Sequence, residues 1–246
     1  LLSFESDTAA FYGLLGSARE LSQRAIDSAN GSDSKETAAA WQMDAALREA
    51  EFDNTSRSRH EIASALAEAP TRDVSVLAAL ALARIGDVAQ AERMARDLAQ
   101  HFPLNTVINR YWLPATYASI DIQRKNPAKA LEDLQTTAEY ELGTPLPQFE
   151  VGASLYPVYI RGQVYLLLHR GKEAAAEFQK FIDHRGIAMN CPLGALARLQ
   201  LGRAYGMEGD TVQSRAAYRD FFSLWKNADS SIPVLIAAKS EYAKLQ

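Results

Sequence analysis

The side chains best suited to chemistry in this sequence are four histidines and one cysteine. The histidines are His60, His101, His169 and His184, and no two of them stand at a spacing typical of metal ligands. Cys191 follows His184 across a glycine-containing loop, so these two side chains could form a nucleophile and its base. No oxyanion-stabilising motif and no third orienting group accompany them. We therefore expect neither a metal site nor catalysis at these positions.

The usual signatures of cofactor and phosphate binding are also missing from the sequence. It has no Gly-x-Gly-x-x-Gly run, no Walker-type loop and no Gly-x-Ser-x-Gly elbow. The carboxylates Glu49, Glu51 and Asp53 stand close together among basic neighbours, and we expect them on a solvated helix face. The sequence therefore predicts a chain that is not an enzyme and needs no cofactor.

Aromatic residues beside proline form a more informative pattern. The sequence contains an internal helix-hairpin repeat. Matching places in two consecutive units of it hold Tyr111-Trp112-Leu113-Pro114 and Leu155-Tyr156-Pro157-Val158-Tyr159. One interpretation is that both prolines mark helix starts or kinks and that the aromatic rings fill the core. The other is that Trp112, Tyr156 and Tyr159 line the concave wall of a binding groove. Both interpretations stay open at the level of sequence.

Polar residues in register with these aromatics extend the groove hypothesis. The repeat register places Arg84, Gln163 and Arg203 toward the same concave side. Aromatic and arginine side chains together are typical of binding hot spots. The candidate binding groove for a protein or peptide segment therefore consists of Arg84, Trp112, Tyr156, Tyr159, Gln163 and Arg203.

Composition limits the classes of partner. The chain has 246 residues, with 26 Lys and Arg against 30 Asp and Glu, which gives a net charge of −4. Without a basic excess we expect no nucleic acid partner and no anionic membrane partner. No apolar run is long enough to span a bilayer, and a lone cysteine cannot form an internal disulfide. The compartment stays open between cytoplasm and periplasm.

The elements that must position these residues are helices. Apolar residues recur at three- and four-residue spacing almost throughout, and alanine is abundant at the small positions. The pairs Gly86-Asp87 and Gly209-Asp210 each combine a helix-ending glycine with an aspartate that can cap the next helix. Such punctuation predicts helix hairpins joined by short turns.

A repeat organises the hairpins. Gly162-Gln163-Val164-Tyr165 recurs one repeat length later as Gly202-Arg203-Ala204-Tyr205, and each run precedes a helix with matching small and large residues. The pattern resembles the tetratricopeptide repeat, in which a small residue of one helix receives a bulky residue of its partner. It predicts an all-α superhelix of about six helix pairs over residues 1–246, as a single domain. The stretch Ser230 to Gln246, with Pro233 near its start, is expected to form a capping helix.

Several longer strings are more specific than the repeat. They are Ala45–Phe52, Tyr111–Pro114, Tyr140–Gly143, Leu155–Gly162, Glu177–Lys180, His184–Gly186, Leu224–Lys226 and Ala228-Asp229. On these strings the chain resembles the C-terminal tetratricopeptide-repeat region of bacterial, notably acidobacterial, eukaryotic-like serine/threonine protein kinases.

The resemblance implies a scaffold or sensory domain of a signalling protein, whose partners include its own kinase domain. In that family the kinase domain lies N-terminal, often with a membrane span between. Similar regions also follow winged-helix DNA-binding domains, so a sensor domain of a transcription regulator is the alternative. The chain starts at Leu1 without a methionine, and we expect it to be the C-terminal part of a longer protein. The resemblance carries over no ligand site.

Overall fold

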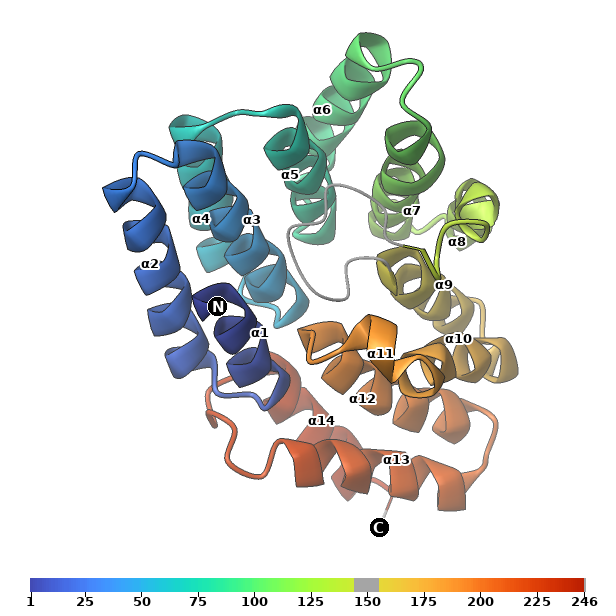
Figure 1. Ribbon diagram of the computed structural model, residues 1–246. Coiled ribbons are helices and arrows are strands. Elements are labelled where there is room, and N and C mark those ends of the chain that lie inside the picture. The colour runs from blue at the N-terminus through green and yellow to red at the C-terminus, as the bar shows by residue number, and fades with distance from the viewer. Residues whose placement is uncertain (144–154, 246) are drawn as a thin grey trace.

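The described chain is built from helices alone. The computed structural model describes residues 1–143 and 155–245, and these residues contain no strand (Figure 1). The pairs that pack as hairpins are α1 (Leu2–Phe11) with α2 (Leu15–Gly31), α3 (Lys35–Glu51) with α4 (Thr55–Glu68), α5 (Arg72–Arg84) with α6 (Val88–His101), α7 (Leu113–Gln123) with α8 (Pro127–Asp133), α9 (Tyr156–Leu167) with α10 (Gly171–Asp183), and α12 (Pro192–Met207) with α13 (Thr211–Leu224). A short α11 (Arg185–Ala188) precedes α12, and α14 (Pro233–Ala243) follows α13. The all-α prediction is confirmed.

The turns within hairpins follow the predicted glycine and aspartate signals. Gly86 and Gly209 have φ angles of 82° and 77°, a left-handed conformation that glycine adopts without strain. The next residue in each case caps a helix: the carboxylate of Asp87 accepts a hydrogen bond from the Gln90 amide, and that of Asp210 from the Gln213 amide. These short turns force the two helices of a hairpin to run antiparallel.

Glycine-to-aromatic packing joins the helices of the last two hairpins. A Cβ atom added at Gly162 would lie 2.5 Å from Cζ of Phe178, and one added at Gly202 would lie 2.7 Å from Cδ2 of Tyr218. Because glycine has no side chain, an aromatic ring of the partner helix occupies the space beside it. The predicted small-to-large contact within these hairpins is confirmed.

The prolines beside the aromatic residues and the proline of the C-terminal stretch stand at helix starts. Pro157 and Pro233 stand in the first turns of α9 and α14, where a missing N–H costs little. Pro114 follows the π-helical turn Ile108–Trp112 at the start of α7. Thr116 Oγ1 donates a hydrogen bond to the Trp112 carbonyl there, at 2.9 Å. The aromatic residues beside the prolines thus sit at the entry to the first helix of a hairpin.

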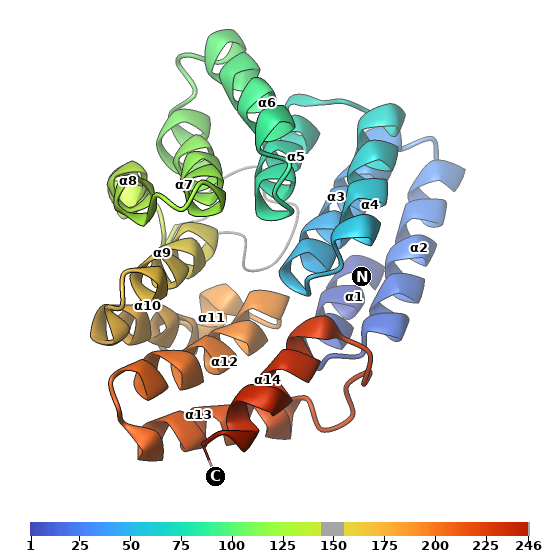
Figure 2. The ribbon, with the colours of Figure 1, turned by 180° about the vertical axis from the view of Figure 1, so that it is seen from behind.

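The hairpins follow one another around a ring whose two ends meet (Figures 1 and 2). The helices α3, α5, α7, α9 and α12 pack each on the next, and α12 also packs on α1. Indole Nε1 of Trp225, just after α13, donates a hydrogen bond to the Phe11 carbonyl at 2.9 Å. The Asp229 amide donates to the Gly13 carbonyl at 3.0 Å, and Asp229 Oδ2 accepts from the Gly16 amide at 2.7 Å. The first and last hairpins are therefore joined directly.

Candidate functional site

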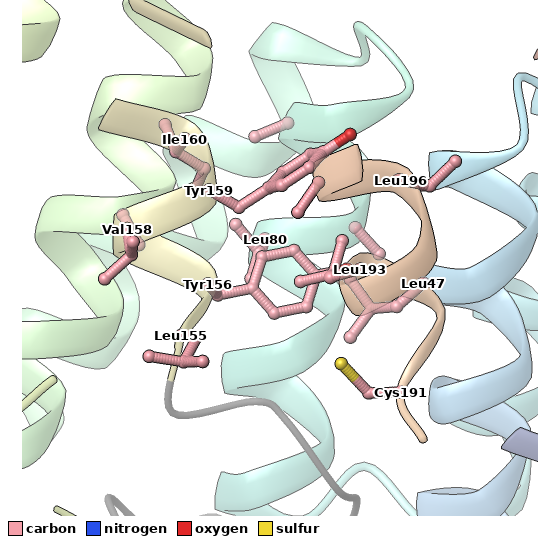
Figure 3. Packing of buried hydrophobic residues seen from close by; sticks show 14 of the residues in the cluster. Leu47, Leu80, Leu155, Tyr156, Val158, Tyr159, Ile160, Cys191, Leu193 and Leu196 are labelled. Atoms are coloured by element: carbon pink, nitrogen blue, oxygen red, sulfur yellow. The ribbon is translucent and has the colours of Figure 1, made fainter. Parts of the chain in front are cut away.

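The three aromatic residues proposed from sequence for a groove wall lie inside the protein. Trp112 is 0% exposed, Tyr159 2% and Tyr156 6%. Figure 3 shows the Tyr156 ring between Leu80 of α5, Leu47 of α3 and Leu193 of α12. Helix α9 packs on α7 and on α12, and these neighbours cover its inner face. In this conformation the rings pack as core, as the first of the two sequence interpretations expects.

The three polar residues proposed from sequence are partly exposed, and two of them surround Tyr159. Gln200 Nε2 donates a hydrogen bond to the Tyr159 hydroxyl at 3.2 Å, and Arg203 Nη1 donates to Gln200 Oε1 at 3.3 Å. Arg84 on α5 and Arg203 on α12 both interact electrostatically with Tyr159. Gln163 lies one helical turn after Tyr159 on the same face of α9. We call Arg84, Gln163, Gln200 and Arg203 the polar rim.

Both arginines of the polar rim are held by glutamates. Arg84 Nε and Nη2 donate to the two carboxylate oxygens of Glu51 at 2.7 and 2.8 Å. Arg203 Nε and Nη2 donate to those of Glu241 at 2.9 and 2.8 Å. Burial works to raise the pKa of Glu241, but Arg203 and the Tyr218 hydroxyl outweigh it and hold that pKa below its usual value. Paired guanidinium forks of this kind are fixed in position.

One polar atom of the rim has no hydrogen-bond partner. Oε1 of Gln163 is buried and makes no hydrogen bond within the described part of the chain. More than nine-tenths of buried polar groups in proteins are hydrogen-bonded, so such an atom calls for an explanation. It lies on the face of α9 that carries Tyr159. The arginines of the rim, Arg84 and Arg203, are already paired with glutamates. The rim therefore offers an acceptor that the residues described by the structure do not use.

The expectation that Glu49 and Glu51 lie on a solvated face is wrong. Glu49 is 1% exposed and binds the guanidinium of Arg19 at 2.7 and 2.8 Å, and Glu51 is 7% exposed and binds Arg84. Asp53, by contrast, is exposed. Each arginine comes from a different helix than its glutamate. A search along one helix therefore could not reveal these pairs.

The burial of Cys191 counts against the alternative of a cysteine nucleophile. Cys191 is 2% exposed, and burial raises the pKa of its thiol to about 12. Reactive cysteines show the opposite shift, because their chemistry needs the thiolate. No side-chain hydrogen bond joins His184 to Cys191 among the described residues.

We expect the Cys191 thiol to be inert in the folded protein. With its pKa near 12, the thiolate population at about pH 8 is on the order of a thousandfold below that of an ordinary cysteine. Reaction with a chromogenic aromatic disulfide should be slow in buffer and immediate in denaturant. Equal rates under the two conditions would contradict the burial of this residue and restore the enzyme alternative.

Two further properties of residues 1–143 and 155–245 bear on ligand classes. They contain no cluster of three or more histidine, cysteine, aspartate or glutamate side chains that could hold a metal ion. None of their helices combines the length and the apolar character needed to cross a membrane.

Comparison with known proteins gave no match among family models, curated proteins or solved structures. The resemblance to kinase repeat regions therefore stays a prediction from the residues.

Proposed function

We propose that this chain is a non-catalytic interaction domain that binds an extended peptide or protein segment along its polar rim. Its helix hairpins with glycine-to-aromatic contacts support a tetratricopeptide-like α-α superhelix, closed here into a ring. The burial of Cys191 counts against catalysis. The strings quoted above support an origin in the C-terminal region of a bacterial serine/threonine protein kinase, and its own kinase domain is one candidate partner.

The observation that carries the proposal is the buried Oε1 of Gln163, which has no hydrogen-bond partner among residues 1–143 and 155–245. Leaving a buried acceptor unsatisfied costs about 1–3 kcal/mol, which a folded protein recovers when a ligand supplies the donor. The backbone N–H of an extended peptide is a donor of suitable size, and every peptide carries many of them. Arg84 and Arg203, fixed by Glu51 and Glu241, add polar groups around Tyr159, which lies one helical turn before Gln163.

The gene sequence immediately upstream of the Leu1 codon tests the kinase origin. A protein kinase domain there supports the proposal as stated. A winged-helix domain would instead make the chain the sensor of a transcription regulator, with the same interaction role.

Replacement of Gln163 by leucine is expected to stabilise the protein and to weaken partner binding. Gln163→Leu keeps the side-chain volume and removes the unsatisfied oxygen, so the free energy of unfolding should rise by about 1 kcal/mol. Affinity for the peptide should fall by at least about tenfold, because one hydrogen bond is lost. Peptides selected on the wild-type protein from a random library would serve as probes, with dissociation constants from fluorescence anisotropy.

The matched control is Gln23→Leu on α2, an exposed glutamine away from the rim whose amide donates a hydrogen bond to Asp27. We expect this variant to bind the selected peptides as the wild type does. Failure to select any peptide, or equal affinity of Gln163→Leu and wild type, would refute binding along the polar rim.

A further inference from the structure

A hollow lies where the two ends of the ring meet. It has a volume of about 550 Å³ and is lined by residues that follow α1 and by residues of α11, α12 and α13 and the turn after α13. Arg185, Arg198 and Lys226 contribute three positive charges to its wall, and Asp220 contributes one negative charge. The whole chain carries a net charge of −4, so this concentration of cations runs against the average of the molecule. We call this feature the cationic hollow.

Among the described residues, the three cations of the hollow lack the carboxylate partners that several other arginines have. Arg48, Arg84 and Arg161 all contact carboxylates within 4.0 Å. Among the described residues, no ion pair includes Arg185, Arg198 or Lys226. The guanidinium of Arg198 instead donates to the backbone carbonyl of Gly194 and lies over the Phe11 ring, 5.8 Å from its centroid.

The charge on Arg198 is the least favourably placed of the three. It is only partly exposed, and its carbonyl partner is neutral. Burial, and then the charge of Arg185, lower the pKa of Arg198, and Asp220 opposes them only in part. Arg185 is a like charge close to the partly buried Arg198, and such repulsion destabilises a fold unless a counter-charge joins the two groups. An anion in the hollow would supply that counter-charge.

We propose that the cationic hollow binds a dianionic phosphate group. The excess of two positive charges in the wall matches a dianion. Guanidinium groups bind phosphate oxygens through two parallel hydrogen bonds, and a lysine ammonium adds a point charge. Ser223 and Tyr12 also line the hollow, so a hydroxyl donor and an aromatic face are present as well. None of these residues belongs to the polar rim, and the proposal stands without peptide binding there.

The same dianion can come from two sources, free inorganic phosphate or a phosphorylated serine or threonine of a protein. Calorimetric titration of the full chain with inorganic phosphate and with a short phosphoserine peptide distinguishes them. Tighter binding of the peptide assigns the hollow to a phosphorylated segment, and equal or tighter binding of the free ion assigns it to phosphate itself. The unphosphorylated peptide should bind at least about tenfold more weakly than its phosphorylated form.

Variants of the wall test the site itself. Arg185→Gln and Lys226→Gln change exposed side chains and should leave the fold intact, while Arg198→Gln removes the central guanidinium. We expect each to weaken binding of the tighter probe, Arg198→Gln by at least about tenfold. Binding should also weaken from about pH 7.5 to about pH 5, because the second phosphate pKa lies near 6.

The control is Arg219→Gln, which removes an exposed charge on α13 outside the hollow and should bind the probe as the wild type does. Absence of binding by both phosphate probes would overturn the proposal. So would affinities of Arg185→Gln and Lys226→Gln equal to that of Arg219→Gln.

Discussion

Replacement of Trp225 by alanine is expected to lower the free energy of unfolding by about 3–5 kcal/mol. The Trp225 side chain is 3% exposed, and its ring centroid lies 4.7 Å from that of Phe221 and 5.3 Å from that of Phe52. Its Nε1 also donates to the Phe11 carbonyl. The substitution therefore removes a large buried volume and the hydrogen bond that joins the end of α13 to α1.

Urea denaturation followed by circular dichroism measures this loss. Trp41→Ala is the matched control, because Trp41 is only partly buried against a small separate cluster and should cost less. Trp225→Phe keeps most of the ring and should lose about 1 kcal/mol for the hydrogen bond. Hydrogen exchange of the α1 amides should accelerate in Trp225→Ala but not in Trp41→Ala. Equal losses in the two alanine variants would show that ring closure adds nothing to stability.

Replacement of Glu51 by glutamine is expected to have a similarly large effect, about 3–5 kcal/mol. The side chains of Glu51 and Arg84 are 3% and 11% exposed, and they bridge α3 and α5 through two hydrogen bonds. Burial disfavours the charge on Arg84, but Glu51 outweighs it, so the pKa of Arg84 stays above its ordinary value. Glutamine has the same shape and no charge, and it leaves a buried guanidinium without compensation.

A double-mutant comparison isolates this effect. Glu51→Gln combined with Arg84→Met should be more stable than Glu51→Gln alone, because the second substitution removes the uncompensated charge. The control is Glu92→Gln, which breaks the exposed pair with Arg124 and should cost at most about 1 kcal/mol. A loss in Glu51→Gln no larger than in Glu92→Gln would contradict the burial of the pair.

Local signals in the sequence were sufficient to predict the hairpins. The Gly-Asp pairs stand where helices end and begin again, and Gly162 and Gly202 receive the aromatic rings that the repeat assigned to them. These features depend on residues a few turns apart, for which spacing is informative.

Closure of the ring could not be predicted in this way. It depends on curvature that accumulates over all hairpins and on contacts between opposite ends of the chain, such as Trp225 with Phe11 and Asp229 with Gly13. At Gly13 an added Cβ would lie 2.8 Å from the Trp225 ring, but a single glycine carries no hint of so distant a partner.

The same limit explains the outcome for the candidate site. The sequence pattern identified the helices that carry Trp112, Tyr156 and Tyr159, but the burial of their rings depends on helices distant in the sequence, such as α5 and α12 around Tyr156. In the closed ring they are core. Arg84 and Arg203 are partly exposed, because a charged group needs either water or a carboxylate partner. Each of them is paired with a glutamate of another helix.

Site-specific photo-crosslinking in the native host tests the proposed interaction role most directly. A photoreactive amino acid placed at Gln163 in the full-length protein should trap a protein partner upon irradiation, because that position lies on the polar rim. The same amino acid at Gln23 on α2 should give no adduct. Adducts of equal yield at both positions, or none at Gln163, would contradict binding along the polar rim.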